Sequence, residues 1–513
     1  MNHNKQFIRA LFKDCSDCVI REFEIKPNIP ALAVFVDGLV NTGWVNEALQ
    51  SIMVFEGGSK DIQTLSNAAL PVSQMQITDN YGDFLISVLG GDTGIIVEGN
   101  DQALLLGIRG PKTRSISEPE TEAVVRGPRE GFIENLRVNT SLLRRKLKTP
   151  RLKTKPFTLG THTNTNIVIS YLEGVCDPRI VAEVEGRLQK LKIDGILDSG
   201  YIEELIEDSI YSPFPQIQYT ERPDIVASAL LQGRVAVFVD GTPFVLIVPT
   251  VFWHLMQASE DYYERFQMGT LIRFLRYVFL LLALVTPAFY IAITTFHQEL
   301  IPTSLLLSIA AAREAIPFPA VVEAFIMEIT FEALREAGIR LPKAVGQAVS
   351  ILGALVVGQA AVEAGIVSAP MVIVVAVTGI ASFTIPRFNG AIAIRMLRFP
   401  LMIAAAIFGM YGILIGIMLI LGHMAGLRSF GVPYLSPAGP MSAGDLKDIL
   451  IRAPWPLLDT RPQYMPVRDG RRMNMDMQKD ILAQNGQTGA NVSHERERVE
   501  KPEGADVNDA PEQ

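Results

Sequence analysis

Residues 344–386 read AVGQAVSILGALVVGQAAVEAGIVSAPMVIVVAVTGIASFTIP, and Glu363 is the one charged side chain in the stretch. A helix needs about 20 apolar residues to cross a bilayer. The runs 344–362 and 364–386 meet that length, as do 277–298 and 399–427, and all four lack Asp, Glu, Lys and Arg. A soluble fold has too little polar surface to cover four such runs. The sequence therefore predicts an all-α polytopic membrane domain over 271–427.

The segment 300–342 between the first two runs is apolar but is broken by Pro302, Pro317 and Pro319. Proline removes a backbone donor and clashes with the preceding turn, so a broken or re-entrant helix is expected first. A second helix follows, and Glu328 and Glu332 share one of its faces, which indicates an interfacial or subunit-facing helix rather than a lipid-facing one.

The positions of the arginines do not fix the number of crossings. Arginines before the first run and arginines at 387–398 both favour the inner side of a membrane, and four simple crossings cannot place both there. Four to six crossings remain open.

The helix expected over 344–364 is rich in glycine and alanine, which let helix backbones approach closely in lipid. Ordinary helix packing explains this composition. A sharper hypothesis is a pore wall in a ring of subunits, with a polar entrance and an aliphatic constriction. Its candidate residues fall on one helical stripe: Gln347, Ile351, Ala354, Gly358 and Val362. Glu363 lies off that stripe and could equally anchor the helix end.

The first 270 residues contain a degenerate repeat. ALAVFVDGLVN at 31–41 aligns with IVISYLEGVCD at 167–177, and an amphipathic segment follows each. The stretches 93–108 and 234–249 are also alike, with an acidic residue and a glycine at each expected hairpin turn. We expect an α/β soluble N-terminal region of two related subdomains, 1–150 and 151–270. Residues 428–513 are expected to be a polar C-terminal tail, partly disordered.

A basic segment over 126–155 links the two subdomains. It has ten Lys and Arg residues against two Glu, in a chain with 46 basic and 54 acidic residues overall. Its apolar residues recur at helical spacing, which predicts an amphipathic helix. A solvated face, contact with anionic lipid headgroups and docking on a neighbouring subunit all remain open. The subunit-contact candidates are Arg126, Arg129, Glu130, Arg144, Arg145, Glu328 and Glu332.

Several function classes are disfavoured by composition and motif. The formal net charge of −8 and the lack of aromatic residues beside the basic segment argue against nucleic-acid binding. No nucleotide-binding, zinc-protease or hydrolase motif is present, so neither an enzyme nor a cofactor is expected. Cys15 and Cys18 form an isolated C-x-x-C without a second ligand pair. The N-terminus lacks the apolar core of a signal peptide, so the N-terminal domain is expected to stay in the cytoplasm.

Three stretches carry a resemblance to a known family. They are 311–386, which begins AAREAIPFPAVVEAFIMEITFEALREAGIRLP, then GIRGPKTRSISEPETEAVVRGPREGFIENLRVNTSLLRRKL at 107–147, and RVAVFVDGTPFVLIVPTVF at 234–252. Together they resemble the GerA family of spore germination proteins, A-subunit type. The likeness extends over about residues 30 to 475, including Arg461 and Pro462.

This resemblance implies a multi-pass subunit of a nutrient germinant receptor in the spore inner membrane. It implies a B-type transporter-like subunit that binds the nutrient, a C-type lipoprotein subunit and homo-oligomers of this chain as partners. It also implies an oligomeric ligand-gated cation channel. A non-conducting scaffold, or an accessory membrane subunit that clusters receptors, is the alternative, because a sporulation paralogue shares both domains. A secondary transporter is less favoured, since no repeat relates the spans.

Overall fold

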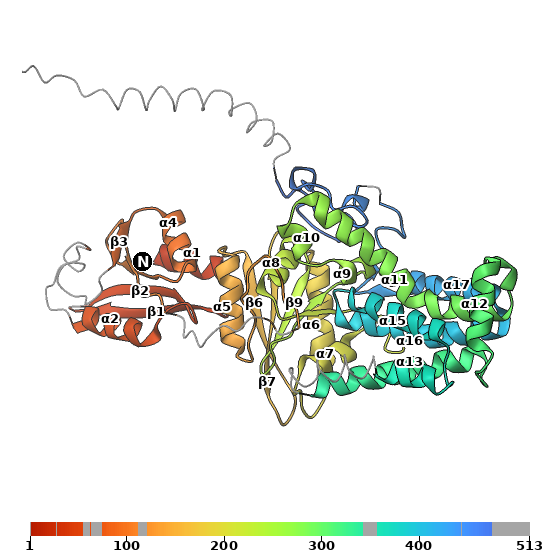
Figure 1. The fold of residues 1–513 in the computed structure, drawn as a ribbon. Coiled ribbons are helices and arrows are strands. Elements are labelled where there is room, and N and C mark those ends of the chain that lie inside the picture. The colour runs from red at the N-terminus through yellow and green to blue at the C-terminus, as the bar shows by residue number, and fades with distance from the viewer. Residues whose placement is uncertain are drawn as a thin grey trace, which may run out of the picture.

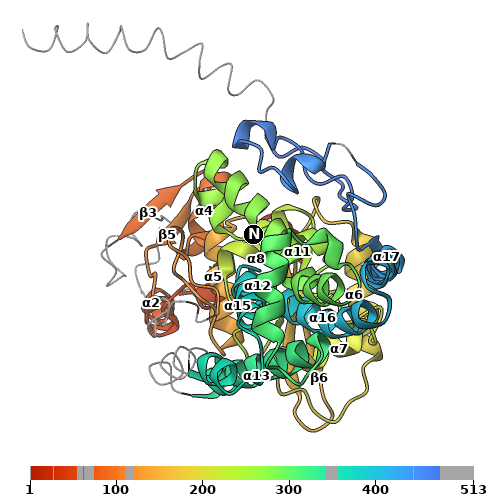
Figure 2. The same cartoon turned by 45° about the vertical axis from the view of Figure 1, so that its right-hand side comes forward.

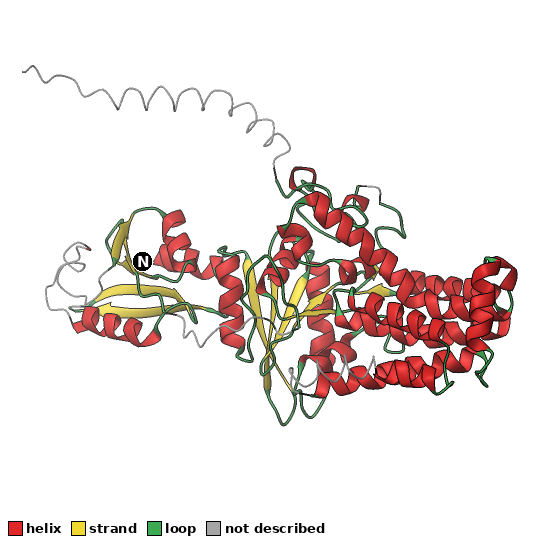
Figure 3. Cartoon of the chain, in the orientation of Figure 1, coloured by secondary structure: helices red, strands yellow, loops and turns green. Residues whose placement is uncertain are grey.

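The computed structural model describes residues 2–26, 28–54, 62, 74–110, 119, 121–341, 356–442 and 444–473. Along this chain, two α/β units are followed by a bundle of helices (Figure 1). The strands gather in the N-terminal half, and the opposite end is helical (Figure 3). The fold class expected from the sequence, an α/β N-terminal region followed by an all-α part, is confirmed.

The first subdomain is a five-stranded antiparallel sheet flanked by helices. Its strands lie in the order β1-β2-β4-β5-β3. Buried apolar side chains cover both of its faces. In the strand β2, for example, seven of the eight residues are buried. Its elements are α1 (Asn2–Leu11), β1 (Cys18–Ile25), β2 (Ile29–Val36), α2 (Thr42–Val54), β3 (Met75–Thr78), α4 (Tyr81–Leu89), β4 (Thr93–Val97) and β5 (Ala103–Leu106).

The second subdomain repeats this arrangement in the strand order β6-β7-β9-β10-β8. Its strands β9 and β10 are buried along their whole length, which is typical of the centre of a sheet covered on both faces. Its elements are α5 (Leu136–Lys146), β6 (Leu152–Leu159), β7 (Thr165–Leu172), α6 (Pro178–Lys190), α7 (Ser199–Ile206), β8 (Gln218–Thr220), α8 (Pro223–Leu231), β9 (Val235–Val239) and β10 (Val245–Val248). The subdomain includes α5, which precedes the boundary expected at residue 150 but packs on α8, β7 and β9.

The strand registers confirm that the two subdomains are related. Ala31 pairs with Val97 in the first sheet, and Ile167 pairs with Val239 in the second. Ala31 and Ile167 are the first residues of the two stretches that align in the sequence. The expected hairpins are present as β4-β5 and β9-β10, which turn just after β4 and β9 end.

A buried ion pair joins the two subdomains. The Arg144 guanidinium on α5 donates from Nε and Nη2 to the two carboxylate oxygens of Asp17, each at 2.8 Å, and both side chains are 1% exposed. Thr154 Oγ1 on β6 donates a further hydrogen bond to Asp17 at 2.9 Å. Burial would raise the pKa of the Asp17 carboxyl, but the charge and hydrogen bonds of Arg144 outweigh it and lower that pKa.

The chain then enters the helical bundle, which Figure 2 brings toward the viewer with α11, α16 and α17 side by side. Two short helices come first, and a 3₁₀ turn, η1 (Gln298–Leu300), follows α11. The helices are α9 (Phe252–Met256), α10 (Glu260–Tyr263), α11 (Phe266–Thr295), α12 (Thr303–Arg313), α13 (Ala320–Arg340), a helical stretch over 356–363, α15 (Ala369–Phe383), α16 (Phe388–Phe408) and α17 (Met410–Gly426).

The single run expected over 399–427 is wrong in its bounds, because the structure contains two helices there. Gly409 has φ +59° and ψ −135°, a conformation that side chains disfavour, and it separates α16 from α17. Helix α16 begins at Phe388 and carries Arg395 and Arg398 within it. The arginines of this helix have partners inside the bundle, and for that reason the helix is not visible in the sequence as a charge-free run.

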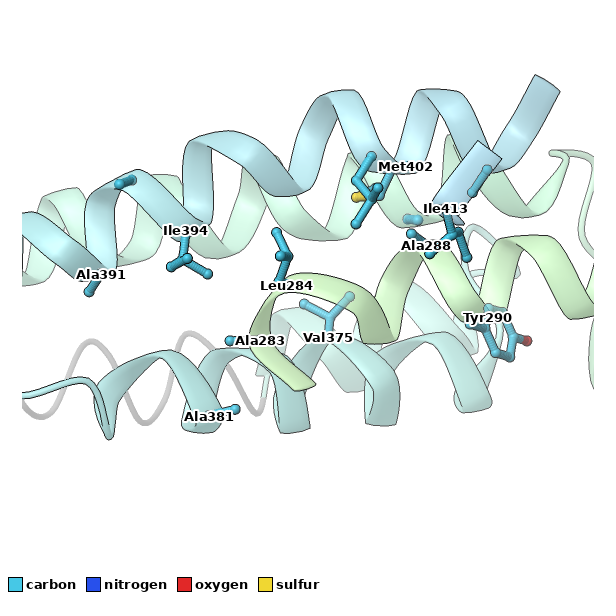
Figure 4. Close-up of a cluster of buried hydrophobic side chains, with 14 of the residues drawn as sticks. Ala283, Leu284, Ala288, Tyr290, Val375, Ala381, Ala391, Ile394, Met402 and Ile413 are labelled. Atoms are coloured by element: carbon cyan, nitrogen blue, oxygen red, sulfur yellow. The ribbon is translucent and has the colours of Figure 1, made fainter. Parts of the chain in front are cut away.

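The bundle core lies between α11, α15, α16 and α17 (Figure 4). Small residues bring these helices close together, since Ala283, Ala288 and Ala381 are fully buried. Leu284, Ile394 and Met402 fill the space between them. Within the described residues, α11 and α16 are the helices long and apolar enough to cross a membrane, and α12, α15 and α17 are shorter apolar helices.

Residues 428–473, which the sequence assigns to a polar tail, are packed on the rest of the chain as far as the structure describes them. Tyr434 is fully buried, and its hydroxyl donates to the Pro215 carbonyl at 2.8 Å. Arg273 Nη1 of α11 donates to Asp448 Oδ1 at 2.9 Å. The segment lies against the start of α11 (Figure 1). Its short elements are β11 (Arg428–Ser429), β12 (Val432–Pro433), η2 (Leu446–Asp448) and η3 (Trp455–Leu457).

Candidate functional site

A buried ion pair crosses the helical bundle between α13 and α16. Arg398 Nη1 donates to Glu328 Oε2, and the two side chains are 1% and 0% exposed. Arg398 Nε also donates to the Ala283 carbonyl of α11 at 2.9 Å. That carbonyl lacks its usual helical donor, because position 287 is a proline without an N–H. The proline of α11 thus creates the acceptor that holds the arginine of α16.

A second ion-paired group lies beside the first. Arg395 Nη1 of α16 donates to Glu332 Oε2 at 3.1 Å, and Arg335 Nη1 donates to Glu332 Oε1 at 3.3 Å. Arg335 Nη2 also reaches Ser382 Oγ on α15 at 3.1 Å. We call Glu328, Glu332, Arg335, Arg395 and Arg398 the charged row. Its contacts connect four helices of the bundle, α11, α13, α15 and α16.

Glu323, at the start of α13, makes a separate junction. It is fully buried, and its Oε1 accepts from Arg313 Nε of α12 at 3.2 Å. Its Oε2 accepts from the backbone N–H of Ser368, the residue before α15, at 2.9 Å. One carboxylate thus fixes the relative positions of three helix ends.

The charged row is not fully satisfied within the described chain. Buried atoms without a hydrogen-bond partner there include Glu328 Oε1, Arg335 Nε and Arg398 Nη2. A buried polar atom without a partner costs about 1–3 kcal/mol, and more when its group is charged. An arrangement that supplied these atoms with water, an ion or a partner side chain would therefore be favoured over the isolated chain.

The first half of helix α13 buries two of its glutamates and exposes two of its aliphatic side chains. Glu323 and Glu328 are fully buried, whereas Ile329 is 58% exposed and Val322 is 36% exposed. The sequence predicted that Glu328 and Glu332 face an interface or another subunit. In the structure they meet arginines of the same chain, because α16 brings Arg395 and Arg398 against them. Apolar side chains on the outer face suit a lipid environment.

Of the predicted pore stripe, Gln347, Ile351 and Ala354 lie outside the described residues. Gly358 is buried, and a Cβ built there would lie 3.2 Å from Val372 Cγ1 of α15. Val362 packs against the bundle core. The opposite side of the 356–363 stretch is exposed and carries Gln359 and Glu363, joined by a 2.9 Å hydrogen bond from Gln359 Nε2 to Glu363 Oε1.

The remaining subunit-contact candidates belong to the basic segment. Arg144 is enclosed in the Asp17 pair described above and has no exposed surface to offer a neighbour. Glu130 accepts from Lys146 Nζ at 2.8 Å and lies 3.5 Å from Arg145. Arg126, Arg129 and Arg145 are exposed, and Arg126 lies 3.8 Å from Glu264. The exposed arginines stay predictions for a subunit contact.

The described residues hold no group of His, Cys, Asp and Glu side chains that could bind a metal ion. Cys15 and Cys18 are free thiols, and burial raises the pKa of both, which keeps them protonated near neutral pH. The chemistry available in the charged row is instead electrostatic. Its ion pairs can stabilise one arrangement of the helices when they form and allow another arrangement when they break.

Arg395 and Arg398 were not predicted as partners of Glu328 and Glu332, because they entered the prediction only as a signal for the inner side of the membrane. A signal was available in the spacing. The two arginines are three residues apart and the two glutamates are four apart, so each pair lies on one face of its helix. Matching faces of opposite charge on two apolar helices indicate that the helices pack together.

The comparisons with known proteins agree with one another. A family model described as Bacillus/Clostridium GerA spore germination protein matches residues 6–464. The chain is 52% identical over 465 residues, 90% of each chain, to a Bacillus subtilis (strain 168) protein named Uncharacterized membrane protein YfkQ. It is 46% identical over 476 residues, 92% of this chain and 88% of the relative, to Spore germination protein KA of the same organism.

Among solved structures, the chain resembles the crystal structure of the N-terminal domain of the A subunit of the Bacillus megaterium spore germinant receptor GerK3. The identity is 32%, the match covers 49% of this chain and 95% of that one, and the TM-score is 0.37.

Proposed function

Because the chain belongs to the GerA family of spore germination proteins, we propose that it forms part of a ligand-gated cation channel as the A subunit of a nutrient germinant receptor. In this proposal it sits in the spore inner membrane as a multi-pass protein, with the two α/β subdomains in the cytoplasm. A B-type transporter-like subunit binds the nutrient, and a C-type lipoprotein subunit and further copies of this chain complete the receptor.

The observation that carries the proposal is the exposed polar face at 356–363. Gln359 and Glu363 lie on the outside of a bundle whose neighbouring surface is apolar, with Val356 54% and Ile373 64% exposed. A carboxylate facing lipid is costly, so polar groups in membrane helices face water or protein. A ring of copies that turned this face toward a shared axis would place carboxylates on a water-filled path, which favours cations.

The structure also offers a gating element for this proposal. The charged row links α13 to α16 through ion pairs and to α15 through the Arg335–Ser382 hydrogen bond, and several of its buried atoms have no partner among the described residues. Nutrient binding to a partner would open the channel if the open arrangement satisfied these groups better, since a ligand shifts an equilibrium only through contacts that differ between the two states.

Reconstitution in liposomes tests the proposal. We expect the purified chain, alone or with its B-type partner, to conduct monovalent cations, and we expect Glu363→Gln to reduce cation flux several-fold. Glu336→Gln is the matched control, because Glu336 is an exposed glutamate of α13 that pairs with Arg340. It should leave flux unchanged. Equal flux in the two variants would place the conduction path elsewhere.

The variant Val362→Ala tests which face of the 356–363 stretch lines the conduction path. Val362 packs against the bundle core, so its truncation should loosen that contact and leak cations without a nutrient. If Val362→Ala leaks and Glu363→Gln conducts normally, the stripe predicted from the sequence, rather than the exposed face, lines the path. A folded protein that conducts in neither wild-type nor variant form would leave the scaffold as the function.

One observation favours the scaffold. The helices of the first subdomain leave large apolar side chains in solvent, with Trp44 and Ile86 each 61% exposed. Exposed apolar side chains of this size can serve as docking points for another protein. A scaffold would give no cation flux, but Trp44→Ala would reduce receptor clustering.

A further inference from the structure

A basic pocket lies where the second subdomain meets the helical bundle and the C-terminal segment. It has a volume of about 570 Å³, which falls within the 300–1,000 Å³ range of small-molecule sites. Its walls come from α8, from the short helices before α11 and from residues 455–472. Its charged lining consists of five basic side chains and one carboxylate: Lys146, Arg234, Arg387, Arg461, Arg472 and Asp224.

Two of these arginines have no carboxylate partner in the described part of the chain. Arg234 donates to Pro249 O at 2.8 Å, Gln218 Oε1 at 3.0 Å and Thr250 Oγ1 at 2.8 Å, all of which are neutral acceptors. Burial lowers the pKa of Arg234 to about 9, and the nearby Arg387 charge contributes to that shift. Arg472 forms no side-chain hydrogen bond or ion pair with a described residue, and burial lowers its pKa as well.

Arg387, the residue before α16, has an unused donor. Its Nη1 donates to Glu122 Oε1, but its Nε is buried without a partner among the described residues, and the residue is 7% exposed. The one lining carboxylate does not compensate for this charge, because Asp224 already accepts from Arg222 Nη2 at 3.0 Å and from the Tyr263 hydroxyl. The pocket therefore holds positive charge that the described chain leaves unneutralised.

The rest of the lining adds no further charge and provides room for an organic group. His254 is neutral, because burial lowers its pKa and its Nδ1 accepts the Val251 N–H at 3.3 Å. Tyr262 and Trp455 supply aromatic walls. Guanidinium groups match the oxygens of phosphates, and a phosphomonoester carries about −1.5 to −2 charges at pH 7. Two unpaired guanidiniums and an unused donor suit such a dianion better than a single carboxylate.

We propose that this pocket binds the phosphate group of a phosphorylated small molecule or of an anionic lipid headgroup. The ligand would contact Arg472 of the C-terminal segment and Arg387 at the start of α16, and so it would hold the second subdomain, the C-terminal segment and the helical bundle together. This site is independent of the proposed conduction path, and its test does not measure ion flux.

The test is calorimetric binding to the full-length chain in phosphatidylcholine nanodiscs, with inorganic phosphate and phenyl phosphate as probes. We expect saturable binding, tighter for phenyl phosphate because its ring can contact the aromatic wall. Arg472→Gln should weaken binding at least tenfold. Arg428→Gln, which removes an exposed arginine of β11 outside the pocket, should bind as the wild type does.

A second variant controls for the possibility that Arg472→Gln loses binding because it misfolds. Ser228→Phe places a ring at an exposed position of α8 that lines the pocket, so it should block binding without removing a charge. Phosphatidylglycerol in the nanodiscs distinguishes the sources. The site is assigned to a lipid headgroup if phenyl phosphate no longer binds in those discs. It is also assigned to a headgroup if phosphatidylglycerol raises the melting temperature of the wild type but not that of Arg472→Gln. Unchanged binding assigns it to a soluble phosphate.

Two results would overturn the proposal. One is the absence of saturable binding of both phosphate probes together with no response to phosphatidylglycerol that depends on Arg472. The other is equal affinity in Arg472→Gln and Arg428→Gln when both are folded by thermal unfolding.

Discussion

The paired sheets and the helical bundle both bury ion pairs, but they complete them to different degrees. In the sheets, both oxygens of Asp17 are bonded, and the third guanidinium nitrogen of Arg144, Nη1, donates to the Thr149 carbonyl at 2.9 Å. In the bundle, Glu328 and Arg398 each keep a buried atom without a partner in the described chain. An ion pair whose atoms are all hydrogen-bonded stabilises one arrangement. An ion pair with unsatisfied buried atoms carries an energetic cost, which the helices can lower by rearranging or by binding a partner.

The largest expected effect comes from breaking the completed pair. Asp17→Asn keeps the shape of the side chain but leaves the Arg144 guanidinium buried without a counter-charge. Removing one partner of a buried pair costs about 3–5 kcal/mol, so the sheets should unfold at a clearly lower temperature. Hydrogen exchange of β1 and β6 in the full-length protein measures the loss. Glu22→Gln, which breaks surface ion pairs with Lys5 and Arg9, should change little. Equal protection from hydrogen exchange in Asp17→Asn and Glu22→Gln would contradict the view that the Asp17–Arg144 pair holds the two subdomains together.

A smaller effect is expected in the bundle. Arg398→Met should lower stability by about 2–3 kcal/mol, because Glu328 loses its partner but can escape part of the cost by binding a proton. The double variant Glu328→Leu/Arg398→Met should recover most of the stability, since well-packed apolar residues can replace a buried pair. Thermal unfolding in detergent measures both. If the double variant were no more stable than the single one, the pair would be as structurally necessary as Asp17–Arg144.

The smallest effect concerns an unfavourable charge within the sheets. Burial raises the pKa of Glu203 on α7 to about 8, and Glu207 and Asp198 add to the shift. The folded state then binds a proton more tightly than the unfolded state, so this group's contribution to stability is present in acid and is lost as the pH rises from about 5 to 8. Glu203→Gln should stabilise the protein by about 1–2 kcal/mol at pH 8 and by nothing at pH 5.

Melting temperature as a function of pH checks this prediction, with Glu204→Gln as the control at an exposed neighbouring position. Parallel pH profiles for the wild type and Glu203→Gln would show that the carboxyl ionises normally in the folded protein.

The sheets were predictable in outline because their signals are local. The alignment of 31–41 with 167–177 reflects two strands that pair in the same register with β4 and β9. The acidic-glycine turns were also readable from the sequence, since a hairpin joins strands that are neighbours along the chain. The Asp17–Arg144 pair was not predicted, because its two residues are 127 positions apart and their types alone do not indicate that they meet.

The bundle was predictable in composition but not in arrangement. The apolar runs predict the helical content, but the helix boundaries within 388–427 differ from those expected, because Gly409 breaks the helix inside an uncharged run. The amphipathic pattern of α13 was visible, but the direction of its charged face was not. In an apolar environment a charged side chain is more stable against a partner inside the protein, so Glu328 and Glu332 point toward the arginines of α16.

The sequence by itself determined the class of each half, the repeat in the first and the family, because all three depend on residue types and their order along the chain. The tertiary structure alone decided that Glu328 meets Arg398, that the freed Ala283 carbonyl holds the same arginine, and that four arginines from three segments surround one pocket. These contacts join residues far apart in the chain, and whether a buried charge is satisfied depends on what the fold brings to it.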